Sequence, residues 1–585
     1  MALKCFLSWK KMKTTLSLII LCIWGSSLSG QDTIAYEIFN ANSLEFAVMA
    51  DGRLFHTPDG GGDLVSTVRD DGGSGLGFAG LWLTDLTPGE SLQYAEHSKI
   101  DEDNTFRPGI VYSHNEGADL SEVIPMNKVW RVTRADILAH IADFRDNFQI
   151  DNPVPAAIMA WPGAGNPHFA ENNDMPELPE GIDDLAPFED YNHDGRYNPL
   201  DGDYPMVPPL TLYPDLNIPD EIFWLSFVPN LYFYESIEVH LLGSIYYCDG
   251  FYDEDSYTLN HTLSLDYFVY NDWFEDFESL TASLYLEFLP ACGGGFVGSR
   301  PTKDMIYHYA PNYYQDCPDR RPNIVACRGL NKPSFLNENN SFEQVGYDIL
   351  TRFLPEEEAD GAHQQPPDHG GQIRNYAMGL WRTGELMRYG GDGYNTTMDA
   401  DTVTSLFPGS PAIPYDWNAS DANLSPGKRM GVISTPPIFF RRRTFEHFQY
   451  AIMLPVQSLS APTLESSAHV FEEAFDEMDF TAEMLKGHPI WSINCPRIND
   501  TEETTSPGAA DLILSPNPAG QQVRLEVEGG RCERYRIFNL QGQLVQERLA
   551  PQREETLDVS DWQSGVYIVQ AVVEDGILVR QLLVE

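Results

Sequence analysis

A segment between Phe188 and Pro205 carries oxygen-bearing side chains at a spacing that suits a metal ion. It reads FEDYNHDGRYNPLDGDYP, in which alternate positions from residue 190 to residue 194 are aspartate or asparagine. Gly195 permits a sharp bend, and calcium prefers roughly six to eight oxygen ligands at about 2.3–2.6 Å on such a curved loop. The sequence therefore predicts a calcium-binding loop with these ligands: Asp190, Asn192, Asp194, the backbone carbonyl of Arg196, Asn198 and Asp201.

The flanks of this loop indicate what the ion would do. The loop resembles those of EF-hands and dockerins, but DYPMVPP follows it, and its prolines are incompatible with a continuing helix. Asp201 stands where an EF-hand carries its closing glutamate. A fully ligated ion leaves no open position for chemistry, so the predicted role of calcium is structural. The competing interpretation is a loop of Asx turns that holds no metal.

The familiar catalytic motifs are missing or incomplete. HExxH is not present, which argues against a zincin, and YGGDGY (389–394) lacks the Lys-Ser/Thr end of a phosphate loop. GGSGLG (72–77) has Leu76 where a nucleophile elbow needs glycine. AHQQPPDHGG (362–371) contains the only His-Pro-Asp cluster, which we interpret as an exposed loop. We therefore assign no catalytic residue.

The chain is strongly acidic, with 37 basic against 87 acidic residues and a formal net charge of -50. This balance argues against nucleic acid, whose phosphates attract clustered Lys and Arg, and against anionic lipid surfaces. The densest basic run is Arg441 to Arg443. Because it follows the apolar segment PPIFF, an internal cluster of salt bridges is favoured over an anion site.

The first 30 residues are predicted to be a cleaved secretory signal peptide. Four lysines precede an apolar run, Leu16 to Trp24, that is too short for a membrane helix. No later apolar run is long enough, so no transmembrane segment is expected. Six cysteines follow residue 30, and an even number permits disulfides in an oxidising compartment. Proximity in sequence alone favours the pairs Cys317–Cys327 and Cys248–Cys292.

Alternating apolar and polar residues, interrupted by 46 glycines and 41 prolines, indicate a mostly β, multi-domain protein with few helices. Its middle is expected to be β-sandwich-like, with an N-terminal β-rich region (31–215) and a central β-rich region (216–495). The N-terminal region contains one helix and the calcium-type loop, 188–205. Asp51-Gly52, between two strand-like runs, predicts a hairpin turn.

Two helices are expected. The first follows Thr133 as N-cap and the second spans His469 to Leu485. Apolar residues at helical spacing predict the buried stripes of the two helices, which are Ile137, Ile141 and Phe144 in the first and Phe471, Phe475 and Met478 in the second.

The polar, Pro/Gly-bearing segment 496–510 is predicted to be a linker to a separate C-terminal domain, 511–585. Beyond it, Val523, Leu525 and Val527 alternate with charged residues, and Asp575-Gly576 marks a hairpin. Five or more short strands at this spacing predict a small immunoglobulin-like β-sandwich.

Three motifs of this domain resemble the type A sorting domain of type IX secretion. They are LSPNPA at its start, YRIFNLQGQLV in its middle, and SGVYIVQAV followed by a basic residue and LLV at its end. The resemblance implies recognition by the type IX machinery of the outer membrane, cleavage of the domain, and delivery to the cell surface or medium. It also implies surface lipopolysaccharide as a partner after cleavage.

The middle of the chain resembles a large uncharacterised group of exported proteins that carry the same sorting domain. Five segments match in order between residues 40 and 455: KVWRVTRADILAHI, MAWPGAGNPHF, LAPFEDYNHDGRYNPLDGDYP, YAMGLWRTGELMRYGGDGY and SLFPGSP. The group implies no activity. The function we expect is calcium-stabilised binding or adhesion, with a glycan or protein ligand contacted by aromatic rings of Tyr-rich loops such as YGGDGY. The alternative is a secreted hydrolase of polysaccharide or protein.

Overall fold

The computed structural model describes most of the chain between residues 33 and 584. The described residues are 33–41, 43–66, 75–86, 92–97, 106–113, 121–178, 182, 185–207, 218–230, 237–246, 258–272, 276–289, 294–309, 324–336, 342–397, 399–411, 413, 415–420, 422, 424–455, 464–486, 511–515, 519–528, 532–539, 544–549, 554–560, 562, 565–573 and 576–584. The predicted signal peptide, the linker 496–510, and Cys248, Cys292 and Cys317 lie outside them.

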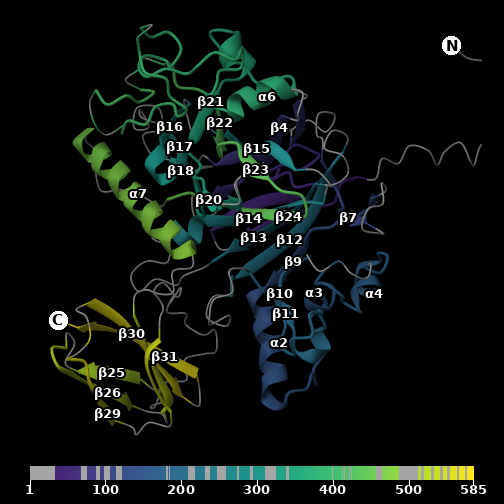
Figure 1. Ribbon diagram of the computed structural model, residues 1–585, viewed down its shortest axis with the longest axis vertical. Coiled ribbons are helices and arrows are strands. Elements are labelled where there is room, and N and C mark those ends of the chain that lie inside the picture. The colour runs from purple at the N-terminus through teal and green to yellow at the C-terminus, as the bar shows by residue number, and fades with distance from the viewer. Residues whose placement is uncertain are drawn as a thin grey trace, which may run out of the picture.

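Two antiparallel sheets form the body of the protein (Figure 1), as the prediction of a mostly β fold requires. Among the described residues the larger sheet has nine strands, with β9 (Trp130–Thr133) pairing with β12 beside the main path. The order of the other eight is β16 (Phe296–Arg300), β17 (Met305–Tyr309), β18 (Ile324–Gly329), β24 (Thr444–Met453), β14 (Thr262–Asn271), β13 (Ile237–Ile245), β12 (Glu221–Pro229) and β6 (Phe106–Pro108).

The smaller sheet has six strands within the described part of the chain. They are β21 (Ile349–Phe353), β22 (Arg429–Ser434), β15 (Phe277–Phe288), β4 (Leu76–Leu86) and β5 (Leu92–Glu96), with β23 (Ile438–Phe440) also on β15. Isolated bridges connect β4 to a further sheet of β1 (Tyr36–Ala41), β2 (Leu44–Met49) and β3 (Val65–Ser66). Strands from both sides of residue 215 therefore share the body of the protein.

The main core lies between these two sheets. Alternate side chains of each strand point inward to the core, and the others point to the outer face. In β14, Leu263, Leu265, Tyr267 and Val269 belong to this core, whereas Asp266 and Phe268 point to the opposite face. Strand β15 repeats the pattern from Leu280 to Phe288. The predicted turn is present near the start, where Gly52 has a positive φ of 93° and its N–H bonds to the carbonyl of Met49.

Helices cover parts of the outer faces. Helix α2 (Arg134–Asn147) begins as predicted, since the Thr133 hydroxyl accepts a hydrogen bond from the Asp136 N–H, and Ile137, Ile141 and Phe144 are buried. With α3 (Ala156–Met159) and α4 (Phe169–Asn173) it forms a second core against β9, β12 and β13. Figure 1 shows this group below the sheets.

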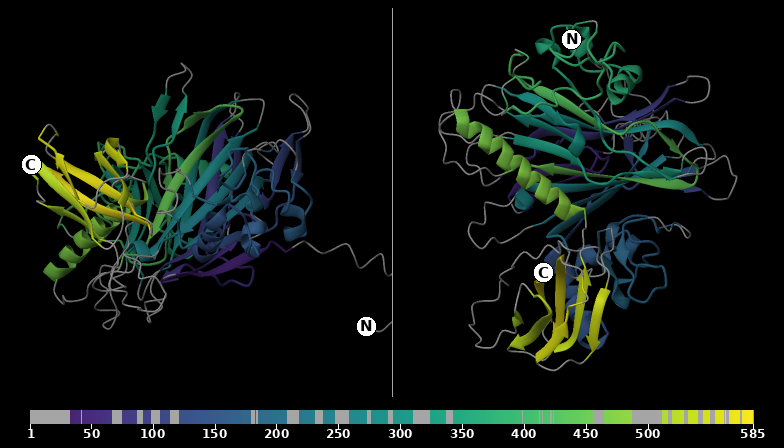
Figure 2. Two further views of the ribbon diagram at one scale, coloured as in Figure 1. Left: turned by 90° about the horizontal axis from the view of Figure 1, so that it is seen from below. Right: turned by 60° about the vertical axis from the view of Figure 1, so that its left-hand side comes forward.

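Helix α7 (Leu464–Leu485) lies across the opposite end of the larger sheet (Figures 1 and 2). Its predicted stripe is buried, with Phe471 packing on Tyr309 and Phe475 on Tyr307. The helix begins at Leu464, earlier than the predicted His469. The short helix α6 (Gly370–Ala377), which was not predicted, covers β4 and β5.

Smaller elements complete the body. Three two-stranded ribbons are β7 (Ile110–Ser113) with β8 (Ser121–Ile124), β10 (Phe188–Glu189) with β11 (Tyr204–Pro205), and β19 (Ser334–Leu336) with β20 (Phe342–Gln344). The short 3-10 helices are η2 (Pro199–Asp201), η5 (Thr258–His261), η6 (Pro301–Lys303), η7 (Glu356–Glu358) and η8 (Ala362–Gln364).

The C-terminal domain is a small sandwich with its own core, as predicted (Figure 2). Val523, Leu525 and Val527 are buried in it. One sheet contains β25 (Asp511–Ser515), β26 (Gln522–Glu528) and β29 (Glu554–Asp558); the other contains β28 (Leu544–Leu549), β27 (Cys532–Asn539), β30 (Gly565–Val573) and β31 (Gly576–Val584).

The predicted Cys317–Cys327 disulfide is wrong, because Cys327 is a free, fully buried thiol. Proximity in sequence misled the prediction, since Cys327 lies within β18 and points into the core between the sheets. Burial there raises the pKa of the thiol well above its usual range. Among the described residues, no helix is both long and apolar enough to cross a membrane.

Candidate functional site

The predicted metal loop is closed at its base by a short β-ribbon. Its ends meet in the ribbon of β10 and β11, where Phe188 pairs with Pro205 and Glu189 with Tyr204. The loop packs on α2 through the rings of Tyr191 and Phe144, whose centroids are 4.7 Å apart.

The first half of the loop brings three of the predicted ligands together. The two carboxylate oxygens of Asp190 accept hydrogen bonds from the N–H groups of Asp194 (3.2 Å) and Gly195 (2.7 Å). The Asn192 side chain accepts from the Asp194 N–H and donates to the Asp194 carboxylate, at 3.0 and 3.1 Å. Gly195 has a φ of 77°, which supplies the predicted bend. Asp190, Asn192 and Asp194 therefore share one tight turn.

The second half contains the remaining predicted ligands. The Arg196 N–H donates to the Asp194 carboxylate at 2.8 Å. Asn198 caps the 3-10 helix η2 by accepting from the Leu200 N–H, and its amide donates to the Asp201 carboxylate at 2.7 Å. Asn198 and Asp201 thus form their own pair.

One residue of this loop was missed by the sequence analysis. Asp203 is fully buried and accepts hydrogen bonds from the N–H groups of Tyr191 (2.9 Å) and Asn198 (2.8 Å), so it joins the two halves. Burial, reinforced by the negative charges of Asp190 and Asp194, raises the pKa of Asp203 to about 6. Asp203 lies two residues beyond the end of the D-x-N-x-D-G-x-x-N-x-x-D pattern. The additional aspartate so close to the pattern could have indicated its involvement.

The chemistry of the donor set suits a hard cation, because all of the predicted ligands offer oxygen. The negative charges of Asp190 and Asp194 add to the effect of burial in raising the pKa of Asp203, so a cation would be attracted to this loop. In the described part of the chain, however, no three His, Cys, Asp or Glu side chains are grouped as metal ligands. The carboxylates instead hold backbone N–H groups, which is the geometry of Asx turns. Calcium binding remains a prediction.

A second candidate surface lies among the loops between α6 and β22. Residues 385–417, which we call the aromatic lobe, carry large side chains that face solvent: Leu386, Tyr389, Ile413 and Tyr415. The ring of Tyr389, which is 49% exposed, contacts that of Trp417 with 4.5 Å between centroids. The Tyr-rich loop YGGDGY thus carries half-exposed Tyr389 at its start, while the ring of Tyr394 stacks on that of His363 with 3.7 Å between centroids.

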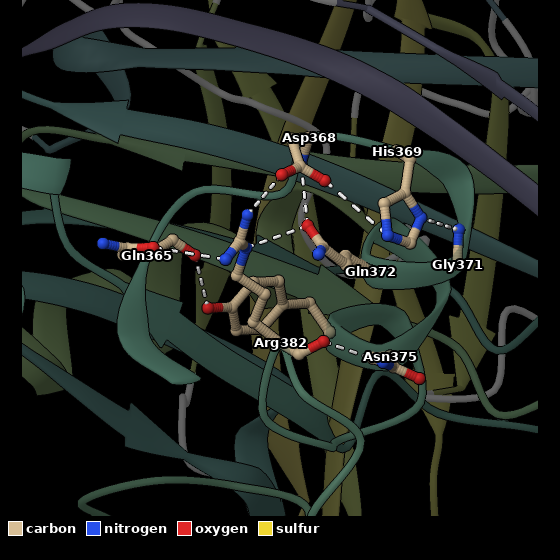
Figure 3. A network of polar contacts seen from close by, with 8 residues as sticks. Gln365, Asp368, His369, Gly371, Gln372, Asn375 and Arg382 are labelled. Atoms are coloured by element: carbon tan, nitrogen blue, oxygen red, sulfur yellow. Dashed lines mark hydrogen bonds and ion pairs between the residues drawn. The ribbon is translucent and has the colours of Figure 1, made fainter. Parts of the chain in front are cut away.

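A polar network fixes the chain that leads into the aromatic lobe (Figure 3). The Arg382 guanidinium donates to the side chains of Gln365 (3.2 Å), Gln372 (2.8 Å) and Asp368 (2.6 Å). Asp368 and His369 are both exposed, and Nε2 of His369 lies 3.6 Å from a carboxylate oxygen of Asp368. The His-Pro-Asp cluster is therefore an exposed, internally bonded loop, as expected from the sequence.

Residues 514–585 match the model of a protein family, the secretion system C-terminal sorting domain. The C-terminal sandwich is therefore a type IX secretion sorting domain, as its motifs predicted. The domain marks the protein as secreted, typically to the cell surface or the medium, and implies contact with the type IX machinery. No curated protein sequence matches this chain.

Similarity to solved structures is weak. A polysaccharide lyase shares 8% identity at a TM-score of 0.18, covering 66% of this chain and 37% of the lyase. Dimeric latent PorU from Porphyromonas gingivalis shares 11% sequence identity at a TM-score of 0.11, covering 55% of this chain and 31% of PorU. The CBM51-2 and INT domains of Clostridium perfringens ZmpB share 10% sequence identity at a TM-score of 0.11, covering 65% of this chain and 97% of those domains. This chain thus spans well under half of the first two proteins, and none of these similarities supports a function.

Proposed function

We propose that this secreted protein is a glycan-binding or adhesive protein of the cell surface, and that the aromatic lobe holds its ligand. The observation that carries the proposal is the half-exposed ring of Tyr389, which packs on the buried ring of Trp417. Aromatic rings offer a flat apolar face with a polar edge, which suits the mixed apolar and hydroxyl surface of a sugar ring. Scattered apolar residues on a surface need no explanation, but a cluster of them indicates a binding surface.

The rings of the aromatic lobe are held by hydrogen bonds rather than by strands or helices. The Trp417 indole donates to the Gly391 carbonyl at 2.9 Å, and the Tyr389 N–H donates to the Asp401 carbonyl at 2.8 Å. The Gly409 N–H donates a hydrogen bond to the Trp417 carbonyl. Rings that are already fixed lose little conformational entropy when a ligand binds, so this support favours affinity.

Calcium is proposed as a structural ligand of the loop 188–205. The carboxylates of Asp190 and Asp194 support this role, because their charges add to burial in raising the pKa of Asp203. Its effect would be to stiffen the region that packs on α2, which lies apart from the aromatic lobe along the chain.

The proposal is tested with the exported protein on arrays of bacterial and plant polysaccharides. The Tyr389→Ala variant should weaken binding to the recognised glycan about tenfold, the equivalent of one stacking contact. Tyr36→Ala removes a similarly exposed tyrosine from β1 and is the matched control. Unchanged binding by Tyr389→Ala, or no glycan bound by the parent protein, would reject the aromatic lobe as the binding surface.

A further inference from the structure

The outer face of the larger sheet carries a second group of rings, far from the aromatic lobe in sequence. Register places Phe445 of β24 opposite Tyr270 of β14, and His447 opposite Phe268. The ring centroids of Tyr270 and Phe445 are 5.4 Å apart. Phe268 and His447 stack with 4.5 Å between centroids and 5° between planes. These four rings form one continuous surface, which we call the sheet platform.

Part of the sheet platform faces solvent. Phe445 is 51% exposed, and the His447 side chain is 27% exposed. The α2–α4 group covers the neighbouring β12 and β13, where Trp224 belongs to its core, and Phe268 packs against the margin of that core. At the other end α7 covers β17. Phe445 and His447 therefore lie on the stretch between these two helical covers.

A buried carboxylate fixes the orientation of His447. Its Nε2 lies 2.7 Å from a carboxylate oxygen of Asp266, which is fully buried. Nε2 faces this carboxylate, so Nδ1 is the ring nitrogen left for another hydrogen bond. His447 thus presents a defined hydrogen-bonding atom beside the exposed ring of Phe445.

Three consecutive arginines adjoin this platform. Arg441 to Arg443 connect β23 to β24 and form the only run of three basic residues in a chain of net charge -50. Arg442 and Arg443 are exposed. Arg443 adopts a φ of 58° just before β24. It stands two residues from Phe445, a separation of at most about 7 Å between Cα atoms.

We propose that the sheet platform binds a carboxylated polysaccharide, with a sugar ring on Phe445, a uronate carboxylate on Arg443 and a hydroxyl on His447 Nδ1. Charge complementarity selects this ligand, because a local cation on an acidic protein attracts anionic groups and the remaining surface repels them. Guanidinium groups pair with planar carboxylates through two parallel hydrogen bonds. The sheet platform would thus be a second surface for the proposed glycan binding, and its ligands would be carboxylated polysaccharides.

Binding of the exported protein to polygalacturonate is the test, with uncharged dextran as the comparison polymer. Phe445→Ala should weaken binding about tenfold. Arg443→Gln should weaken it by a similar factor at low salt, and the difference from the parent protein should shrink in molar salt, where the screening length falls to about 3 Å. Arg443→Lys, which keeps the charge, should retain more binding than Arg443→Gln.

The controls separate this surface from the aromatic lobe. Tyr389→Ala should bind polygalacturonate like the parent protein, whereas loss of binding in Tyr389→Ala alone would assign the polymer to the aromatic lobe and overturn the inference. Equal binding of dextran, normal binding by Phe445→Ala and Arg443→Gln, or binding only to phosphatidylglycerol vesicles would also overturn it. Both substituted residues are exposed, and an unchanged melting temperature confirms that each variant is folded.

Discussion

The carboxylate of Asp51 and the guanidinium of Arg53 form an ion pair with an O–N distance of 2.8 Å, although each side chain is only 1% exposed. The pair spans the turn at Gly52, and the His97 ring bonds to the Asp51 carbonyl at 2.7 Å. Burial lowers the pKa of His97 to about 3, so the ring is neutral. The buried charges at this turn therefore belong to Asp51 and Arg53.

Removing one member of this pair should be strongly destabilising. Asp51→Ala leaves the Arg53 charge buried, and we expect the free energy of unfolding to fall by about 3–5 kcal/mol. Urea unfolding followed by tryptophan fluorescence measures the change. The double variant Asp51→Leu, Arg53→Met should lose less, because neither charge remains. A loss below about 1 kcal/mol in Asp51→Ala would contradict this account.

Calcium should stabilise the protein through the loop 188–205. The double variant Asp190→Ala, Asp194→Ala should have a lower melting temperature than the parent in millimolar calcium, because ligand binding to the folded state raises stability. In EGTA the difference should be smaller, because only the hydrogen bonds that these carboxylates accept from backbone N–H groups are then lost. Asp146→Ala, which removes an exposed aspartate of α2, is the control. An equal difference in both conditions would show that these aspartates act only through Asx turns.

Glu446 should make stability depend on pH. Burial raises the pKa of this carboxyl from the ordinary 4.5 to about 7. The folded protein therefore holds the proton more tightly than the unfolded chain. Its stabilising contribution is full below about pH 4.5 and is lost as pH rises through 7. The stability difference between the parent and Glu446→Gln, from urea unfolding at pH 4 to 8, should change across that window. A constant difference would contradict the burial of an ionisable group there.

The sorting domain should be necessary for export but not for the body of the protein. Deletion of residues 511–585 should leave the remaining chain inside the outer membrane, since the type IX machinery has no domain to recognise. Immunoblots of periplasm, cell surface and medium measure its location. Deletion of the linker segment 500–505 is the control and should not prevent export. Normal surface delivery of the shortened chain would reject the assignment of this domain.

Sequence patterns predicted the features that depend on neighbouring residues. Thr133 as N-cap and the spacing of Ile137 and Ile141 identified α2, because capping and helical periodicity are local. The C-terminal sandwich was predicted for the same reason, since its strands follow one another with short turns. The motif around Asp190 and Asp194 likewise predicted the tight turn that they form.

Features that depend on distant pairing were not predictable. Nothing near Phe268 indicates that His447 lies against it, because strand order and register decide that contact. The error at Cys327 has the same origin. The position of this residue in β18 points its thiol into the core, and closeness in sequence to Cys317 does not change that. Asp203 was missed because its burial follows from how the loop closes rather than from its spacing.

The order of strands in the two sheets also determines when the chain can fold. Asp85 of β4 accepts a hydrogen bond from the N–H of Ser279 in β15, 194 positions later, and β14 has β24 as its neighbour on one side. Such distant partners make folding slow and leave strand edges unpaired in the meantime. The body cannot close until residue 453 has crossed the inner membrane. A nascent chain that stops before β24 would therefore expose the edge of β14 and become a substrate for periplasmic chaperones and proteases.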